Sequence, residues 1–307
     1  MFSRKLSQNH RQNPSRLGYS AGAAGFRRPD LPGHPLLNAR QRVVLYTAIA
    51  GVYLLGIFLW GLLLRPEAYA VHYAHKFMPP GVTHLFGADF MGRDMLCRCV
   101  KGLANSLVIG LTAALISSGI GVILGVSAAL TGGLYDKLVL LGVDCCMGLP
   151  HLVLLILISF MLGRGARGVM LGIALTHWPE LTRLIRAEVL QLREALFTRA
   201  AAKMGKTGFQ IAREHILPHI FPVYIVGLVL LFPHAIMHEA AITFLGFGLP
   251  AETPAIGVIL SEAMGHLATG KWWLALFPGL MLAAAVILFD VIGENLKSLL
   301  NPISGNE

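Results

Sequence analysis

Long apolar runs alternate with shorter polar stretches along most of the chain and divide it into candidate membrane helices. A helix needs about 20 mostly apolar residues to cross a bilayer. The pattern predicts six spans, at about 43–64, 103–130, 138–162, 169–193, 220–244 and 273–288. The sequence therefore predicts an all-α membrane protein with six transmembrane helices, which places both termini on the same side of the membrane.

Individual residues inside these runs predict where the helices stop, pack or bend. The dipeptide Arg65-Pro66 ends the first run. Gly121 and Gly125 lie one turn apart in the second run, which allows another helix to approach closely. Pro150 interrupts the third run, so we expect a kink there.

The third and fourth predicted spans carry polar residues. The third contains Asp144 and, directly after its proline, His151. The fourth becomes polar at His177 and continues as a basic amphipathic helix to residue 193. This reading places His177 near the inner end of the fourth span.

The predicted spans divide the chain into one membrane domain and its polar extensions. The expected parts are a disordered basic tail at 1–42, a first transmembrane helix at 43–64, an extracytoplasmic segment at 65–102, a five-helix core at 103–300 with a cytoplasmic loop at 193–218, and a short tail at 301–307.

The composition agrees with a chain that lies in a lipid bilayer. Of its 307 residues, 55% are hydrophobic and 13% are charged, about half the charged share of a soluble domain. A large soluble core would still need a charged shell, whereas the bilayer supplies an apolar exterior. The four cysteines lack the spacing of a zinc site or a redox pair, so packing is their expected role.

Basic residues are concentrated in the first 42 residues and again between 183 and 213, and the net charge is +9. Because cytoplasmic loops are rich in Lys and Arg, both segments and both termini are predicted to be cytoplasmic. Five basic residues between 65 and 101, on the predicted outer side, reduce the difference in positive charge between the two sides without reversing it. A basic tail also suits a transit peptide or nucleic-acid binding, but membrane anchoring explains its charge and no nucleic-acid partner is expected.

The segment from 199 to 218 has the most informative pattern on the predicted cytoplasmic face. Its three alanines at 200–202 favour a tight helix, and Gly205 and Gly208 permit a sharp turn. Apolar and basic side chains lie beside this turn, namely Lys203, Met204, Lys206, Phe209, Ile211 and Arg213. A bent helix with an exposed apolar edge suits docking into a groove on a soluble partner; the alternative is an ordinary cytoplasmic loop.

This segment resembles the Glu-Ala-Ala loop of ABC importer permeases, in which a glycine and then a Leu-Pro pair follow at fixed spacing. The matching residues are Ala200, Ala201, Gly205, Leu217 and Pro218, while Arg199 replaces the family's glutamate. The resemblance implies that the loop docks in a cleft of the ATPase subunits. The expected coupling residues are Ala200, Ala201, Lys203, Met204, Gly205, Phe209, Leu217 and Pro218.

Further motifs extend the resemblance over most of the chain beyond the tail. Phe86-Gly87-Ala88-Asp89 followed by Gly92-Arg93-Asp94 is similar to the Gly-Thr-Asp-x-x-Gly-Arg-Asp signature of the dipeptide, oligopeptide and nickel permeases. Phe244-Leu245-Gly246-Phe247-Gly248, Phe277-Pro278-Gly279 and the ending with Asn301-Pro302 also resemble that family. Because the motifs occur in the family's order, they indicate the second, C-type permease of a heteromeric pair.

The resemblance implies the type I importer permease fold and a place in the bacterial inner membrane. The implied partners are a homologous B-type permease, two ATPase subunits that hold ATP and Mg, an extracytoplasmic substrate-binding protein and the lipid bilayer. This chain is expected to carry no catalytic residue, cofactor or resident metal, because it has no G-x-x-x-x-G-K-[ST] loop for ATP phosphates. Closure of the two ATPase subunits would then pull on residues 200–212 and tilt the bundle of membrane helices.

Several of the 12 histidines lie in apolar surroundings. His234 and His238 are four residues apart and therefore face one side of the fifth span, and Glu239 follows them. Together with His177 they are candidates for a substrate path, because ionisable residues inside a membrane often mark one. Imidazole suits nickel and zinc ions. The His-x-x-x-His spacing before Phe244-Leu245-Gly246 and the Thr176-His177-Trp178 stretch resemble the nickel-type permeases more than typical peptide permeases. This resemblance implies nickel or a metal–chelate complex as the cargo, with short peptides as the alternative. Hydrogen bonding between helices by neutral histidines is the other reading of these residues.

Two other classes of protein are weighed against the importer permease. A self-contained secondary transporter or channel usually shows inverted repeats or broken helices with intramembrane charges, and the sequence shows no convincing repeat. A membrane-bound enzyme would need a catalytic constellation, for which only His234, His238 and Glu239 are available. The importer permease is the favoured class.

Overall fold

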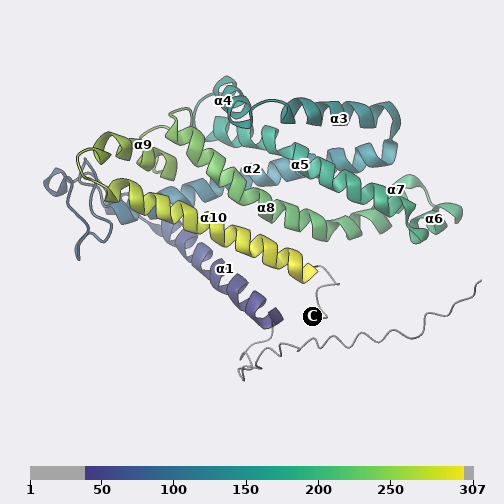
Figure 1. The fold of residues 1–307 in the computed structure, drawn as a ribbon, viewed down its shortest axis with the longest axis horizontal. Helices are drawn as coiled ribbons and strands as arrows, with labels where there is room; N and C mark the ends of the chain where they lie inside the picture. Colours follow the sequence, from purple (N-terminus) through teal and green to yellow (C-terminus); the bar gives the residue numbers. More distant parts are fainter. Residues whose placement is uncertain (1–38, 301–307) are drawn as a thin grey trace, which may run out of the picture. The chain divides into compact units, whose positions relative to one another are not determined.

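The computed structural model describes residues 39–300, and this part of the chain is built of α-helices joined by turns (Figure 1). The described region contains no strand; its one β-type contact is an isolated antiparallel bridge between Ala88 and Asp94. The predicted tails at 1–42 and 301–307 lie outside the described residues, except that residues 39–42 form the start of the first helix. The expectation of an all-α protein is confirmed.

Five long helices and several shorter ones make up the described region. The long helices are α1 (Ala39–Leu63), α2 (Met95–Thr131), α5 (Ala166–Glu194), α8 (Leu217–Phe244) and α10 (Trp273–Leu300). The shorter helices are α3 (Gly133–Met147), α4 (His151–Met161), α6 (Leu196–Lys203), α7 (Gly208–Ile211) and α9 (Ile256–Leu267), with a π-helical turn at Ala212–Ile216 and 3-10 turns at Pro66–Tyr69 and Tyr73–His75.

A helix or helix pair is present at each of the six predicted spans. By length and composition, four helical segments of the described region can cross a membrane: α1, α2, α10 and the continuous segment Gly208–Phe244. The pair α3 and α4 would form a fifth span, bent by 98°, so the kink expected at Pro150 is confirmed. α5 is long enough to cross, but the charged residues of its second half exclude it from this apolar group.

Two predictions differ from the structure, namely the start of α2 and the absence of a helix between α8 and α10. α2 begins at Met95, eight residues before its predicted start, because Asp94 caps it by accepting a hydrogen bond from the Cys97 amide at 2.9 Å. α9 lies within the stretch that was read as an outer loop. The predicted continuation of the fourth span as a helix beyond His177 is confirmed, because α5 runs unbroken through Pro179 to Glu194.

α2 lies at the centre of the helical bundle, where it packs most extensively against α5 and also against α8, α1 and α9. The close approach expected at its glycines is confirmed. A Cβ atom on Gly121 would lie 3.1 Å from Leu181 Cβ, and one on Gly125 would lie 2.9 Å from the Thr182 carbonyl oxygen. Only glycine allows α5 to come this near to α2.

The charged half of α5 is tied to its neighbours by ion pairs. Arg186 forms two 2.6 Å hydrogen bonds with Asp136 of α3, and Arg183 pairs with Asp144 of the same helix. Arg193 donates to the Ala129 carbonyl near the end of α2. These arginines therefore hold α5 against α3 and α2.

The turns of the chain separate two ends of the bundle. Figure 1 shows α6 and α7 at one end, whereas α9 and the segment between α1 and α2 lie at the opposite end. The helices α2, α5 and α8 run between these two ends, whereas α1 and α10 extend from the α9 end only part of the way (Figure 1). The predicted docking bend and the predicted outer motif are therefore far apart, as their assignment to opposite membrane faces requires.

Candidate functional sites

The segment between α5 and α8 forms a bend with defined local geometry. α6 ends at Lys203, and Gly205 adopts φ +86°, a conformation that residues with a side chain rarely adopt. Thr207 then caps α7, because its hydroxyl accepts from the Gln210 amide at 3.3 Å while the Gln210 side chain accepts from the Thr207 amide at 2.8 Å. This capping box fixes the direction in which the chain leaves the turn.

One face of this bend is packed and the other is open. Ala201, Ile211 and Ile216 are buried in a cluster with Ile185 and Val189 of α5. The opposite face carries four exposed apolar side chains, Leu196, Phe197, Met204 and Phe209. Met204 and Phe209 are 82% and 75% exposed, which is unusual for large apolar side chains next to polar loops.

The remaining predicted coupling residues also surround this open face. Ala200, Lys203, Leu217 and Pro218 are exposed, whereas Ala201 is the buried member of the set. Arg199, which stands at the position of the family's glutamate, pairs with Glu194 at the end of α5. The structure thus brings the predicted set together at one end of the bundle.

At the other end, Asp89 lies at the centre of a buried ion-pair network. Its Oδ2 accepts hydrogen bonds from Arg93 Nε and Arg98 Nη1, each at 2.6 Å. Its Oδ1 accepts from the Met91 and Arg93 amides at 2.8 and 2.9 Å. Glu262 of α9 accepts from Arg98 Nη1 at 2.8 Å and from Arg93 Nη2 at 3.2 Å. Because Asp89 and Arg98 are 1% and 2% exposed, each charge depends on its partners.

The glycines of the same motif are required by backbone geometry. Gly87 and Gly92 have φ of +74° and +75°, where only glycine is unstrained. A Cβ on Gly92 would lie 1.9 Å from the His72 carbonyl oxygen, and one on Gly87 would lie 2.7 Å from that of Met78. These two positions therefore exclude any side chain.

The last residue of the motif, Asp94, joins the network to α2. Besides capping that helix, its Oδ2 lies 2.8 Å from His84 Nδ1. The motif therefore fastens the segment before α2 to both α2 and α9. Asp89, Arg93, Arg98 and Glu262 together form a clamp between this segment, α2 and α9. Arg98 and Glu262 were not among the predicted site residues.

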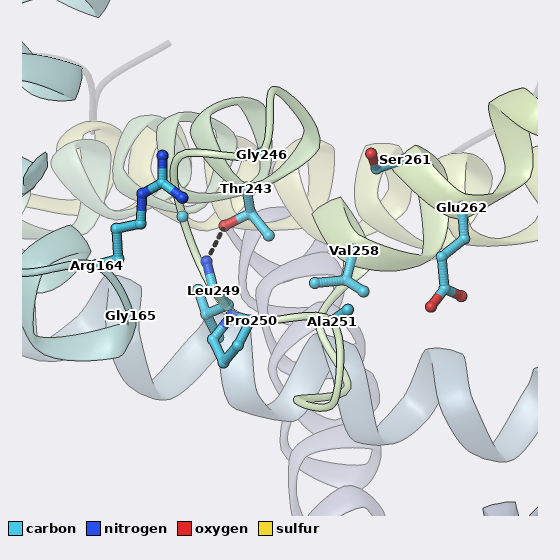
Figure 2. A pocket seen from close by; sticks show the side chains of 11 residues that line it. Arg164, Gly165, Thr243, Gly246, Leu249, Pro250, Ala251, Val258, Ser261 and Glu262 are labelled. Atoms are coloured by element: carbon cyan, nitrogen blue, oxygen red, sulfur yellow. Dashed lines mark hydrogen bonds between the residues drawn. The ribbon is translucent and has the colours of Figure 1, made fainter.

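A pocket of about 400 Å³ opens beside this clamp (Figure 2). It is lined by the end of the α4–α5 loop, by the Phe-Leu-Gly-Phe-Gly loop after α8 and by α9, and Figure 2 shows Arg164 and Glu262 on its opposite sides. The Arg164 guanidinium lies 5.5 Å from the centre of the Phe160 ring and 5.9 Å from that of Phe247. Arg164 thus places a positive charge on one side of the pocket, whereas the Glu262 carboxylate on the other side is already paired with Arg93 and Arg98.

A second pocket, of about 340 Å³, opens between the α3–α4 bend, α5 and α8. His234 and His238 both line it, which confirms that they share one side of their helix, and His177 lines it from α5. His151, at the start of α4, completes the set. His151 was not among the residues predicted for the substrate path, although a polar residue within an apolar run is a signal in itself.

Three of these histidines form a compact cluster. The rings of His151, His177 and His238 have centroid separations of 4.6, 4.5 and 5.0 Å. A nitrogen from each ring lies within 4.8 Å of the nitrogens of the other two. His234 lines the pocket without joining this group.

Glu239, the fourth predicted member of the substrate path, lies apart from the pocket. Its side chain is fully buried, and its Oε1 accepts a hydrogen bond from Thr243 Oγ1 at 3.1 Å. It is absent from the described residues that line either pocket. The structure therefore separates Glu239 from the three histidines with which it was grouped.

Comparison with known proteins defines the family. Residues 121–302, more than half of the chain, match the family described as the inner membrane component of binding-protein-dependent transport systems. The chain belongs to this family, whose members are the permease subunits of ABC importers. The resemblance inferred from the motifs is confirmed.

Curated relatives align over most of the chain. A protein of Brucella abortus named as a peptide transport system permease is 32% identical over 288 residues, covering 92% of this chain and 97% of the relative. The dipeptide transport system permease protein DppC of Bacillus subtilis is 33% identical over 225 residues, covering 73% of this chain and 70% of the relative.

A solved structure supports the fold. The methionine ABC transporter MetNI, in an inward-facing conformation, contains a chain that matches with a TM-score of 0.56 and 19% identity, covering 67% of this chain and 98% of that one. The expected type I importer permease fold is therefore confirmed.

Proposed function

We propose that this chain is one of two permease subunits of an ATP-driven importer and moves short peptides across the bacterial inner membrane. The observation that carries the proposal is the exposed apolar face of the bend at 196–209, which projects from one end of the bundle. Large exposed apolar patches mark binding surfaces, and this one lies at the position of the family's coupling loop.

In this mechanism the bend docks into the two ATPase subunits, which bind ATP and Mg, and both chain termini face the cytoplasm. A substrate-binding protein delivers the cargo at the opposite end, where the Asp89 clamp and the pocket beside it lie. A homologous B-type permease completes the channel. ATP hydrolysis takes place in the partner subunits, and this chain has a mechanical role in the lipid bilayer.

Peptide cargo is supported by the names of the relatives and by the pocket in Figure 2. Arg164 stands on one side of that pocket, where its guanidinium suits the carboxylate end of a short peptide. A second candidate, nickel or a metal–chelate complex, is favoured by the cluster of three histidines. Uptake of a radiolabelled dipeptide and of radiolabelled nickel by the same cells separates these two cargoes.

Removal of the apolar side chains of the bend tests the coupling role. We expect the double variant Met204→Ser, Phe209→Ser to reduce association with the ATPase subunits by about tenfold or more, because each lost apolar contact is worth about 1.5–3 kcal/mol. The measurement is co-purification of the ATPases with the permease, together with peptide uptake.

A matched control is Val82→Ser, which removes an exposed apolar side chain at the opposite end of the bundle. It should leave ATPase association unchanged. Normal ATPase association and uptake by the double variant would exclude the bend as the coupling surface.

A further inference from the structure

We propose that His151, His177 and His238 form a binding site for a divalent transition-metal ion of the Ni²⁺ or Zn²⁺ type. The proposal concerns ion binding by this chain, so it holds whichever cargo the importer carries. The three residues come from α4, α5 and α8, which pack against one another in pairs. An ion at this position would join three helices inside the bundle.

The hydrogen bonds of His177 prepare one nitrogen for a metal. Its Nδ1 lies 2.9 Å from the Ile173 carbonyl oxygen and 3.1 Å from the Thr176 hydroxyl. Because a carbonyl only accepts, Nδ1 carries the proton of the neutral ring and Nε2 keeps a free lone pair. Metal-binding histidines are commonly fixed in this way, with the second ring nitrogen donating to a backbone carbonyl.

Two buried nitrogens at this site lack a partner among the described residues. Nε2 of His177 and Nε2 of His151 are both buried without a hydrogen bond, and His177 as a whole is only 7% exposed. A buried polar atom without a partner destabilises a fold by about 1–3 kcal/mol. Two such atoms in one cluster are accounted for if both bind the same ion.

The geometry of the cluster is close to that of a three-histidine site. Imidazole nitrogens bind zinc at about 2.0–2.1 Å, which places neighbouring ligand atoms about 3.3 Å apart around a tetrahedral ion. The three nitrogens already lie within 4.8 Å of one another, so small side-chain rotations bring them to these distances. Such rotations are available to His151 and His238, which are only partly buried and face an open pocket.

The donor set points to the class of ion. Three neutral imidazoles suit nickel, zinc and copper, whereas calcium and magnesium require oxygen ligands. The same pocket also presents Cys146, Glu180 and His234, any of which could supply a fourth ligand. Glu180 would also offset part of the ion's positive charge.

Direct metal binding tests the site. The importer complex is purified without a histidine tag, stripped with EDTA and titrated with NiCl₂ or ZnCl₂ by calorimetry. We expect one ion per permease chain. We expect His177→Ala and His151→Ala each to weaken ion binding by more than about 100-fold, because loss of a residue that only supports a ligand already costs about 10–100-fold. His219→Ala, an exposed histidine of α8 outside the cluster, is the matched control and should bind as the unmodified chain does.

A second measurement keeps the proposal testable if a variant fails to assemble. Co²⁺ bound to the unmodified complex should show the absorption bands of a tetrahedral ion with imidazole ligands, and excess Zn²⁺ should remove them. Absence of binding by the unmodified complex would overturn the proposal. Equal binding by the unmodified complex and by the His177 and His151 variants would also overturn it.

Discussion

Arg98 shows at the scale of a single residue how a charge is kept inside the start of a membrane helix. Its guanidinium lies between the carboxylates of Asp89 and Glu262 at 2.6 and 2.8 Å and is 2% exposed. The motif that contains Asp89 was recognised from the sequence, but its chemical role was not. Glu262 lies 164 residues beyond Arg98, and one sequence cannot show that two residues this far apart meet.

Replacement of Arg98 by methionine should be severely destabilising. Arg98→Met keeps the apolar stem but leaves Asp89 and Glu262 with one arginine in place of two, and breaking a buried ion pair costs about 3–5 kcal/mol. We expect a lower thermal unfolding temperature for the detergent-purified complex, measured by fluorescence. Arg65→Met, at an exposed arginine of the same segment, should stay within about 0.5 kcal/mol; equal effects of the two variants would contradict the clamp.

At the scale of the helix, the sequence located the spans well and their ends less well. The apolar runs, the kink at Pro150 and the close approach at Gly125 all follow from local patterns and are confirmed. The start of α2 was placed too late because Arg98 and Lys101 read as loop residues. In the structure both are helical, since Arg98 is ion-paired and Lys101 Nζ donates to the Gly61 carbonyl at 3.0 Å.

The contact between α2 and α5 can be tested with two glycines of one helix. A side chain at Gly125 would meet the α5 backbone at 2.9 Å, whereas one at Gly119 has no neighbour within 4 Å. Gly125→Leu should therefore destabilise the bundle by about 1–3 kcal/mol through overpacking, while Gly119→Leu should have little effect. Thermal unfolding of both variants is the measurement, and similar losses for the two would contradict the packing described here.

At the scale of the whole molecule, the order of the helices places the bend and the clamp at opposite ends. The family resemblance implied this arrangement, but the histidine cluster could not be predicted in the same way. His177 and His238 were singled out individually, and only the 98° bend between α3 and α4 brings His151 to them. A bend of that size depends on the packing of the surrounding helices as well as on Pro150.

Labelling of single cysteines tests the orientation of the bundle. In a chain whose four native cysteines are replaced by alanine, Met204→Cys and Val82→Cys place thiols at two highly exposed positions. Because basic segments stay in the cytoplasm, a membrane-impermeant maleimide should label Val82→Cys in intact spheroplasts. Met204→Cys should react only after permeabilisation, and the reverse pattern would overturn the assigned orientation.

The continuous helical segment Gly208–Phe244 has a mechanical consequence. It begins beside the exposed Phe209 and contains His238, about 45 Å further along the chain at 1.5 Å per residue, with a π-helical turn, Pro222 and Pro233 in between. Over that length, a rotation of only about 5° around the end that carries Phe209 displaces His238 by about 4 Å. That distance is comparable to the spacing of the histidine rings, so a slight rocking of this single rod would be enough to assemble or disperse the cluster.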